Sequence, residues 1–296
     1  GLLGSTLLLN APKKMALSAS YHINRLVPNG TSAYYPLDIT KRNAAVKTIQ
    51  QIAPDVVIHT AAQASPDYCD KHPKEAYKVN VEGTRTIVRA CTAIGAKIIY
   101  ITTNGVYNGK NPPYDEMSPR RPIDVYGKTK LEAEHIVESS EAQWTIIRLN
   151  TMYGWNNPFS RQNPVTWLLQ LVGENKTSVN MVTDMSNTFL YVAEAAKAIW
   201  SIALGSYEGH HFNISGKECL SRYEFSLLIA KEFNLDRSMI NQVERSYFTN
   251  FVERPENTCF SNAKMASVLG IHPMSATTAL SAMKRDIVQS SHWKRI

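Results

Sequence analysis

The stretch IIYITTNG, residues 98–105, decides the fold. Four side chains that are mostly apolar, Ile98 to Ile101, are followed at once by small polar residues. A continuous rather than alternating apolar run is typical of a parallel strand that is covered on both faces. Similar runs occur at VVI (56–58) and WTII (144–147). We therefore predict a parallel sheet, with residues 102–105 at the carboxyl end of one strand.

Segments with helical periodicity separate these strands. From about residue 74 to 94 the apolar residues fall on one helical stripe, and Gly95 is placed to end that helix. A second helical pattern follows Tyr126. The alternation of strand and helix predicts a doubly wound α/β fold.

After about residue 150 the composition changes, and the alternation becomes less regular. We predict that residues 1–150, with 182–210 returning to them, form the sheet-containing domain. Residues 151–181 and 211–296 are predicted to form a smaller, substrate-facing lobe. In SRYEFSLLIAKEFNL (221–235), Ser221 and Glu224 have the spacing of a capping box at a helix start.

Composition excludes several classes of protein. The 296 residues, 44% of them apolar, have a formal net charge of +7. The cations are scattered among acids, so we expect no nucleic-acid partner. No apolar run reaches the roughly 18 residues of a membrane span, and no basic stretch precedes the apolar start GLLGSTLLLNA. We therefore expect neither a membrane partner nor a signal peptide.

The cysteine pattern bears on the cellular compartment. Cys69, Cys91, Cys219 and Cys259 lie far apart and show no C-x-x-C spacing. This pattern favours reduced thiols in a cytoplasmic protein over a disulfide framework or a zinc site. No metal site is predicted.

The stretch VYGKTK (125–130) carries the candidate chemistry. Tyr126 and Lys130 are four residues apart, and so they share one face of a helix. A free phenol has a pKa near 10, and an adjacent ammonium favours its phenolate. The Thr103 hydroxyl, at the carboxyl end of a strand, could hold a substrate carbonyl oxygen while the tyrosine protonates it. A surface Tyr–Lys pair and a simple turn at residues 102–105 are the alternatives.

These residues carry a resemblance. Together with HTAA (59–62), NVEGT (80–84) and RPENTCFS (254–261), they resemble the extended short-chain dehydrogenase/reductase superfamily, and most of all dTDP-4-dehydrorhamnose reductases. The phrases ITTNGVYNG (101–109) and PYDEMSPRRPIDVYGKTKLEAE (113–134) are the most similar. The resemblance implies a Rossmann fold that binds NAD(P) and a sugar-nucleotide substrate.

The resemblance also explains the start of the chain. Such enzymes begin with a strand and a G-x-x-G-x-x-G turn that holds the cofactor pyrophosphate. Gly1 and Gly4, with Leu2 and Leu3 between them, match the second and third glycines of that turn. The first strand has no counterpart here, so we expect the sequence to lack on the order of ten residues, a strand and the start of its turn.

Several further positions are implied to contact the cofactor. They are Asp38, Ile39, Ala61, Ala62, Asn80, Tyr126 and Lys130. Within SASYHINR (18–25) there is no acid for the ribose hydroxyls, and His22 and Arg25 favour the 2′-phosphate of NADP. We therefore predict NADPH as the cofactor, with NADH as the alternative and an Arg25 that faces solvent as the competing interpretation.

The family's reaction is hydride transfer from NADPH to C4 of a 4-keto-6-deoxy sugar nucleotide. The resemblance implies that Thr103 and Tyr126 hold the carbonyl oxygen, that Tyr126 donates the proton, and that Lys130 stabilises the phenolate. Arg254 would pair with substrate phosphate or form a structural ion pair.

The sugar-facing positions depart from the family. Thr151 replaces a tryptophan expected beside the sugar, Asn104 stands where an aspartate is common, and the loop at 184–190 lacks the usual Asp-Gln-x-Gly-x-Pro-Thr. Two alternatives therefore stay open. One is a regulatory protein that binds NADP, like the regulatory subunit of methionine adenosyltransferase, and the other is a nucleotide-sugar epimerase or dehydratase with bound NAD. A homodimer is one expected assembly.

Overall fold

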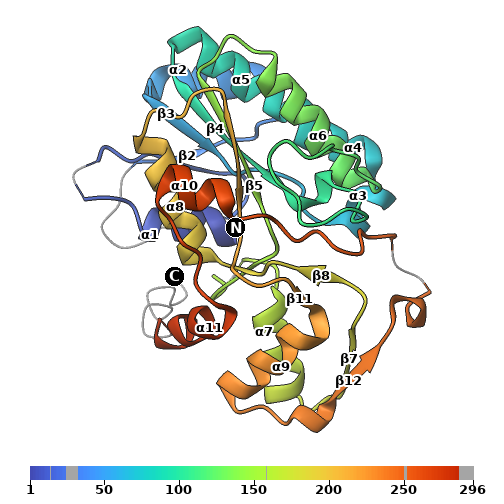
Figure 1. Ribbon diagram of the computed structural model, residues 1–296. Coiled ribbons are helices and arrows are strands. Elements are labelled where there is room, and N and C mark those ends of the chain that lie inside the picture. Colours follow the sequence, from blue (N-terminus) through green and yellow to red (C-terminus); the bar gives the residue numbers. More distant parts are fainter. Residues whose placement is uncertain (14, 25–32, 158, 250–251, 287–296) are drawn as a thin grey trace.

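The computed structural model describes residues 1–13, 15–24, 33–157, 159–249 and 252–286. Figure 1 shows an upper part, in which helices flank a sheet, and a smaller lower lobe of helices and short strands. The predicted α/β fold with a parallel sheet is confirmed.

The main sheet has four parallel strands in the order β10, β5, β4, β3. Their bounds are Val56–His59 (β3), Lys97–Thr103 (β4), Trp144–Leu149 (β5) and His210–Ile214 (β10). The three predicted apolar runs form β3, β4 and β5, and all seven residues of β4 are buried. We predicted that residues 182–210 return to the sheet-containing domain. Because β10 belongs to the main sheet, the returning segment extends at least to Ile214.

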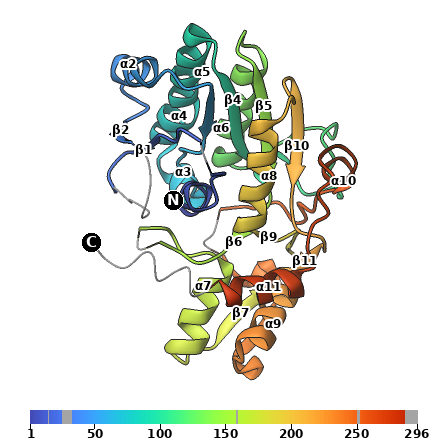
Figure 2. The ribbon, with the colours of Figure 1, turned by 90° about the vertical axis from the view of Figure 1, so that its left-hand side faces the viewer.

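Helices cover both faces of this sheet. One face carries Leu2–Leu9 (α1), Val192–Leu204 (α8) and Ala263–Leu269 (α10), and the other carries Arg42–Ile52 (α2), Gly83–Ile94 (α5) and Val125–Glu138 (α6). Figure 2 shows α8 in front of β5 and β10. Side chains alternate along a strand. Accordingly Ile99 and Ile101 join the core with α1 and α8, whereas Ile98 and Tyr100 join the core with α5 and α6.

Two short strands lie apart from the main sheet. Ala19–Tyr21 (β1) and Tyr34–Pro36 (β2) form a parallel pair. Within the described ranges of the chain, no strand pairing by hydrogen bonds joins β1 or β2 to β3.

A continuous helical stretch fills the predicted helix near residues 74–94. It follows Pro66–Lys71 (α3) and consists of Pro73–Tyr77 (α4), a π-helical segment at Lys78–Glu82, and α5. Gly95 ends it with φ 71°, a left-handed conformation that glycine adopts without steric cost. The predicted helix and its end at Gly95 are confirmed.

The lower lobe is built from short elements. Its helices are Pro164–Leu168 (α7, continued by a π-helical segment at Leu169–Glu174), Arg222–Phe233 (α9) and Ala276–Arg285 (α11), with 3₁₀ turns at Arg237–Met239 and Arg245–Tyr247. Val179–Val182 (β7) pairs with Ile240–Val243 (β12). The predicted capping box is confirmed, because Ser221 accepts from the Glu224 amide and Glu224 accepts from the Ser221 amide.

Two-residue strand pairs connect the lobe to the upper part. Met152–Tyr153 (β6) pairs with Leu190–Tyr191 (β9), and Ser186–Asn187 (β8) pairs with Leu220–Ser221 (β11). Figure 1 shows β8 and β11 between the sheet above and α9 below. This junction lies below the main sheet, between it and the lobe.

The cysteine prediction is wrong for one pair. Cys219 and Cys259 form a disulfide, with Cα atoms 5.5 Å apart, whereas Cys69 and Cys91 are free and buried. The two half-cystines are 40 residues apart in sequence, but both flanking segments bind β8: Ser221 pairs with Ser186, and the Thr258 amide donates to the Ser186 carbonyl. This contact was not evident from cysteine spacing. The predicted cytoplasmic location therefore loses its main support and stays a prediction.

Membrane-spanning helices and clusters of metal ligands are both absent from the part of the chain that the structure describes. None of the helices there combines the length and apolar character needed to cross a membrane. No group of three or more histidine, cysteine or acidic side chains there is placed to hold a metal ion.

Candidate active site

The first turn of α6 is fixed against the end of β4. Asp124 caps the helix and accepts the Gly127 amide at 2.6 Å. Gly127 faces the Gly105 carbonyl so closely that a Cβ atom at this position would clash with it. The 3₁₀ turn at Asn104–Val106 and the start of α6 can therefore approach each other only because residue 127 is a glycine. This contact sets the place of Tyr126.

Tyr126 lies beside Thr103. The residue as a whole is partly exposed, but desolvation of the phenol raises the pKa of Tyr126 to about 12, and the neighbouring Thr103 hydroxyl opposes that rise. The Thr103 hydroxyl also accepts the Gly105 amide at 3.1 Å and donates to Asn104 Oδ1 at 3.2 Å. At neutral pH Tyr126 is thus protonated, and it can donate a proton to an acceptor bound at the end of β4.

Lys130 is buried one turn further along α6. Its Nζ donates to the Ile101 carbonyl at 2.9 Å and lies 4.2 Å from the centre of the Tyr100 ring. Burial lowers the pKa of Lys130 to about 7, and the Glu134 carboxylate partly offsets this effect. The structure thus places the lysine against the backbone of β4, on the same helix as Tyr126. Its predicted effect on the phenol stays a prediction.

Glu134, in the next turn, holds α6 against the sheet. It is fully buried, and Arg148 of β5 donates to it from Nε and from Nη2, the latter at 2.8 Å. Arg120 donates to the same carboxylate at 2.9 Å. A bidentate contact between a guanidinium and a buried carboxylate fixes both the orientation of the two groups and the distance between them. Glu134 and Arg148 therefore keep the helix that carries Tyr126 and Lys130 in register with the sheet.

Asn104 links the catalytic edge to the C-terminal part of the chain. Its Nδ2 donates to Thr258 Oγ1 at 2.6 Å and to Asn150 Oδ1 at 3.3 Å. Asn150 in turn donates to the Thr258 carbonyl at 2.7 Å. The predicted substrate residue Asn104 thus has its amide engaged within the protein.

The other two predicted substrate residues also have partners. Thr151 donates a hydrogen bond to Asn187, and Arg254 donates to Asp67 Oδ2 at 2.6 Å. The predicted alternative for Arg254, an ion pair within the protein, is therefore present in the structure. Asp67 engages Nη2 of Arg254, one part of a group that carries five N–H donors in all.

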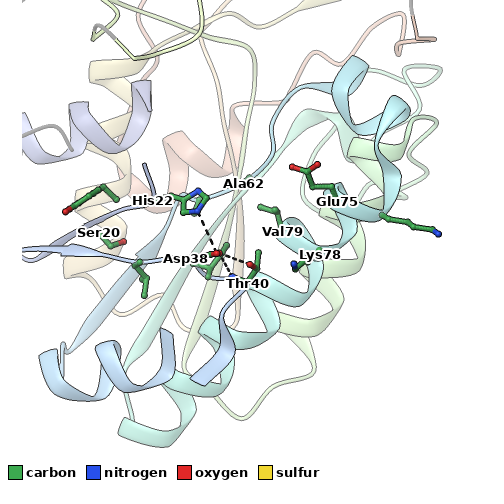
Figure 3. Close-up of a pocket in the computed structure, with 13 residues that line it drawn as sticks. Ser20, His22, Asp38, Thr40, Ala62, Glu75, Lys78 and Val79 are labelled. Atoms are coloured by element: carbon green, nitrogen blue, oxygen red, sulfur yellow. Dashed lines mark hydrogen bonds and ion pairs between the residues drawn. The ribbon is translucent and has the colours of Figure 1, made fainter. Parts of the chain in front are cut away.

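A cavity of about 680 Å³ lies beside β1, β2 and α4 (Figure 3). Of the predicted cofactor residues, Asp38, Ile39, Ala61 and Ala62 line it. The Asp38 carboxylate accepts from the Thr40 amide and hydroxyl at 2.9 and 2.7 Å, and the hydroxyl is the main reason that the pKa of Asp38 is lowered. This end of the molecule could hold the adenosine part of a dinucleotide, because Ile39 supplies an apolar wall and Asp38 a fixed acceptor.

The remaining predicted cofactor residues are placed differently. Leu3 is buried in the core with α8, Gly1 caps α1, and Gly4 lies beside Thr60. Leu2 is partly buried against the same core. Asn80 is fully buried and donates to Thr129 and to the Gln63 carbonyl, so it fixes the loop after β3 against α6. Arg25 lies outside the described residues.

The comparison with known proteins now decides the family. A model of the RmlD substrate binding domain matches residues 1–288. The chain belongs to this family. This membership confirms the predicted resemblance to dTDP-4-dehydrorhamnose reductases.

Three relatives of this RmlD-family chain show the range of its similarities. It is 30% identical over 239 residues to methionine adenosyltransferase 2 subunit beta of Bos taurus, which covers 79% of the chain and 71% of that protein. It is 29% identical to the spore coat polysaccharide biosynthesis protein SpsK of Bacillus subtilis, covering 80% and 81%. The solved dTDP-4-dehydrorhamnose reductase of Bacillus anthracis in complex with NADP superposes with a TM-score of 0.77, at 28% identity, covering 86% and 90%.

In this RmlD-family chain some site residues escaped sequence reasoning. Lys74 and Lys78 line the cavity, and Asp67 is the partner of Arg254. The two lysines lie on a helical stretch whose sequence has an ordinary amphipathic pattern, so the sequence does not indicate that they line a cavity. Asp67 follows a loop whose path after β3 no local pattern predicts. The capping role of Asp124 had a local signal, an acidic side chain directly before a helix, that could have been used.

Proposed function

We propose that this protein reduces the 4-keto group of a nucleotide-linked 6-deoxy sugar with NADPH. The observation that carries the proposal is the closeness of the Thr103 and Tyr126 side chains, which both lie beside Gly105 at the carboxyl end of β4. Lys130 lies on the same helix as Tyr126. In open α/β sheets this edge is where ligands bind. The similarity to the Bacillus anthracis reductase in complex with NADP supports the same assignment.

The residues fit a nicotinamide dinucleotide. The cavity lined by Asp38, Ile39, Ala61 and Ala62 has a fixed hydrogen-bond acceptor and apolar walls, as an adenosine site requires. His22 Nε2 lies 3.8 Å from Asp38 Oδ2, and Lys41 lowers the pKa of Asp38 as well. These nearby positive or protonatable groups favour a 2′-phosphate, and so they favour NADPH over NADH.

The bound cofactor would supply the hydride. Thr103 and Tyr126 would hold the substrate carbonyl oxygen by hydrogen bonds, and Tyr126 would donate its proton to that oxygen as it gains negative charge. The raised pKa of Tyr126 keeps this proton in place at neutral pH. Lys130 would stabilise the phenolate that remains, while its bond to the Ile101 carbonyl keeps its Nζ at a fixed depth.

A second candidate function is regulation of another protein. The similarity to methionine adenosyltransferase 2 subunit beta favours it, and the internal partners of Thr151 and Arg254 are consistent with a less open sugar site. On this alternative the protein would bind NADPH without oxidising it.

A single assay separates the two candidates. Oxidation of NADPH is followed by the loss of its absorbance in the presence of dTDP-4-keto-6-deoxyhexose or the UDP analogue. The reductase proposal predicts oxidation that depends on the sugar nucleotide. Tight NADPH binding with no oxidation on either substrate would contradict it and support the regulatory alternative.

A further inference from the structure

A network of hydrogen bonds connects the Thr103 hydroxyl with the C-terminal part of the chain. Thr103 donates to Asn104 Oδ1 at 3.2 Å. Asn104 Nδ2 in turn donates to Thr258 Oγ1 at 2.6 Å and to Asn150 Oδ1 at 3.3 Å. Asn150 and Thr258 are each only 3% exposed. A buried residue that is far from the catalytic edge in sequence thus reaches Thr103 through one side chain.

Two main-chain groups fix the direction of these hydrogen bonds. The Thr151 amide can only donate, and it donates to Asn150 Oδ1 at 2.8 Å. The Thr258 carbonyl can only accept, and it accepts from Asn150 Nδ2 at 2.7 Å. The orientation of the Asn150 amide is therefore unambiguous. Because Asn150 Oδ1 is the acceptor for Asn104, the Asn104 amide must turn its Nδ2 toward that oxygen and its Oδ1 toward Thr103.

The network gives the Thr103 hydroxyl one orientation. The hydroxyl and methyl groups of a threonine are similar in size, so hydrogen bonds decide between the rotamers that exchange them. Here the hydroxyl oxygen accepts the Gly105 amide at 3.1 Å, and its single proton goes to Asn104. These two bonds hold the oxygen atom close to Tyr126, since the side chains of Thr103 and Tyr126 both lie beside Gly105.

Thr258 makes the shorter of the two bonds that orient Asn104, at 2.6 Å against 3.3 Å for the bond to Asn150. Asn104 is only half-buried, so without the Thr258 hydroxyl its amide could turn toward solvent. The main chain of Thr258 is held separately, because its amide donates to the Ser186 carbonyl of β8. Removal of the hydroxyl should therefore release Asn104 and leave the path of the chain in place.

We propose that Thr258 is a positioning residue for the reduction: acting through Asn104, it holds the Thr103 hydroxyl ready for the substrate carbonyl oxygen. The inference rests on the proposed function, in which Thr103 binds that oxygen. When the oxygen binds, the Thr103 proton turns to it from Asn104 by rotation about the Cβ–Oγ bond. The Gly105 amide keeps the hydroxyl oxygen in place during this change. In this mechanism Thr258 needs no contact with the substrate or the cofactor.

Steady-state kinetics of NADPH oxidation with dTDP-4-keto-6-deoxyhexose or the UDP analogue test the inference on the whole protein. Thr258→Val removes the hydroxyl but keeps the shape of the side chain. Its kcat should fall by about 3- to 10-fold, the contribution of one neutral hydrogen bond, and the KM of NADPH should stay the same. Thr258→Ser keeps the hydroxyl and should restore kcat. An unchanged kcat in Thr258→Val would overturn the inference.

A double-mutant cycle separates this role from a general loosening of the fold. If Thr258 acts through Asn104, the variant that combines Thr258→Val with Asn104→Ala should have the kcat of Asn104→Ala alone. Independent effects would instead multiply, because their free energies add. Multiplied effects would overturn the inference and give Thr258 a purely structural role.

Thr145→Val is the matched control. Thr145 is also a buried threonine, and its hydroxyl donates to the Tyr207 carbonyl at 2.7 Å. It lies near the amino end of β5, whereas the catalytic edge is at the carboxyl ends of the strands. This variant should lower the free energy of unfolding in urea and leave kcat unchanged. A fall in kcat as large as that of Thr258→Val would show that the loss of any buried hydroxyl slows the reaction, and it would overturn the inference.

The outcomes distinguish this inference from the proposed function. A wild type that oxidises NADPH, with a kcat that Thr258→Val does not change, leaves the reaction standing and overturns the inference. If the wild type oxidises no NADPH, the proposed reaction fails. The link between Thr258 and Asn104 is then tested by the same cycle on the free energy of unfolding in urea, where non-additive losses support the link and additive losses overturn it.

Discussion

The catalytic edge and the sugar-facing lobe differ in what holds their polar groups. At the catalytic edge, main-chain atoms hold two polar side chains of α6 and its cap: the Ile101 carbonyl binds Lys130, and the Gly127 amide binds Asp124. In the lobe, side chains bind one another, as Thr151 binds Asn187 and Arg254 binds Asp67. Main-chain partners are fixed by the fold, whereas a side-chain partner can be exchanged for a ligand. The first region is thus preformed, whereas the second is held by side-chain pairs that a ligand can replace.

The largest expected effect tests the preformed region. Tyr126→Phe removes the proton donor but keeps the ring, so kcat for sugar-nucleotide reduction should fall by about 10²- to 10⁴-fold. NADPH binding should be largely kept, as measured by fluorescence titration. Tyr247→Phe, at an exposed tyrosine of the lobe, is the matched control and should leave kcat unchanged. A kcat within threefold of the wild type would remove Tyr126 from its assigned role.

A second change tests what keeps the catalytic helix in register. Glu134→Gln leaves Arg148 buried without a carboxylate, and breaking a buried pair in this way costs about 3–5 kcal/mol of unfolding free energy. Urea unfolding would measure the loss, with Glu141→Gln at an exposed site as the control. Equal stability of the two variants would show that the Arg148–Glu134 pair does not hold α6 in place.

A third experiment uses pH. The pKa of Lys130 is lowered by burial from 10.5 to about 7, so between these values the unfolded chain binds more protons than the folded protein. The free energy of unfolding should therefore rise with pH in this window. Between about pH 7 and pH 9, the titration of Lys130 should increase the free energy of unfolding by about 2 kcal/mol. The measurement compares urea unfolding of the ligand-free wild type and Lys130→Met at both pH values.

Lys130→Met should lose this contribution, whereas Lys128→Met, at an exposed position of the same helix, should retain it. The same rise in wild type and Lys130→Met would mean that another group titrates in this range.

The smallest effect concerns the cofactor end. His22 is mostly exposed, so its interaction with a 2′-phosphate is screened by solvent and should contribute little. His22→Ala should raise the Kd of NADPH by about two- to fivefold and leave that of NADH unchanged. Fluorescence titration measures both Kd values. Equal changes in the Kd of NADPH and of NADH would show that His22 does not contact the 2′-phosphate.

Local patterns predicted the elements of the preformed region. Three apolar runs identified β3, β4 and β5, Gly95 marked the end of α5, and Ser221 with Glu224 marked the start of α9. Each of these signals lies within a few residues of the feature it predicts. The family motif added the positions of Thr103 and Tyr126, which the structure places side by side.

Long-range contacts could not be predicted in this way. The pairing of Arg148 with Glu134, of Arg254 with Asp67 and of Cys219 with Cys259 depends on how distant segments cross. The strands that bring such segments together in the lobe, β8 and β11, are two residues long and have no hydrophobic alternation to reveal them. The contacts in the predicted sugar-facing part of the site therefore required the structure.

The disulfide has a practical consequence for every measurement on the lobe. Cys219 lies three residues before Arg222, the first residue of α9, and Cys259 lies five residues after Arg254, so one covalent bond links these two segments. A sample prepared with a thiol reductant and one prepared without it are chemically distinct proteins in this region. Affinities for nucleotides are comparable between laboratories only when the oxidation state of this cystine has been determined, for example by thiol titration before each experiment.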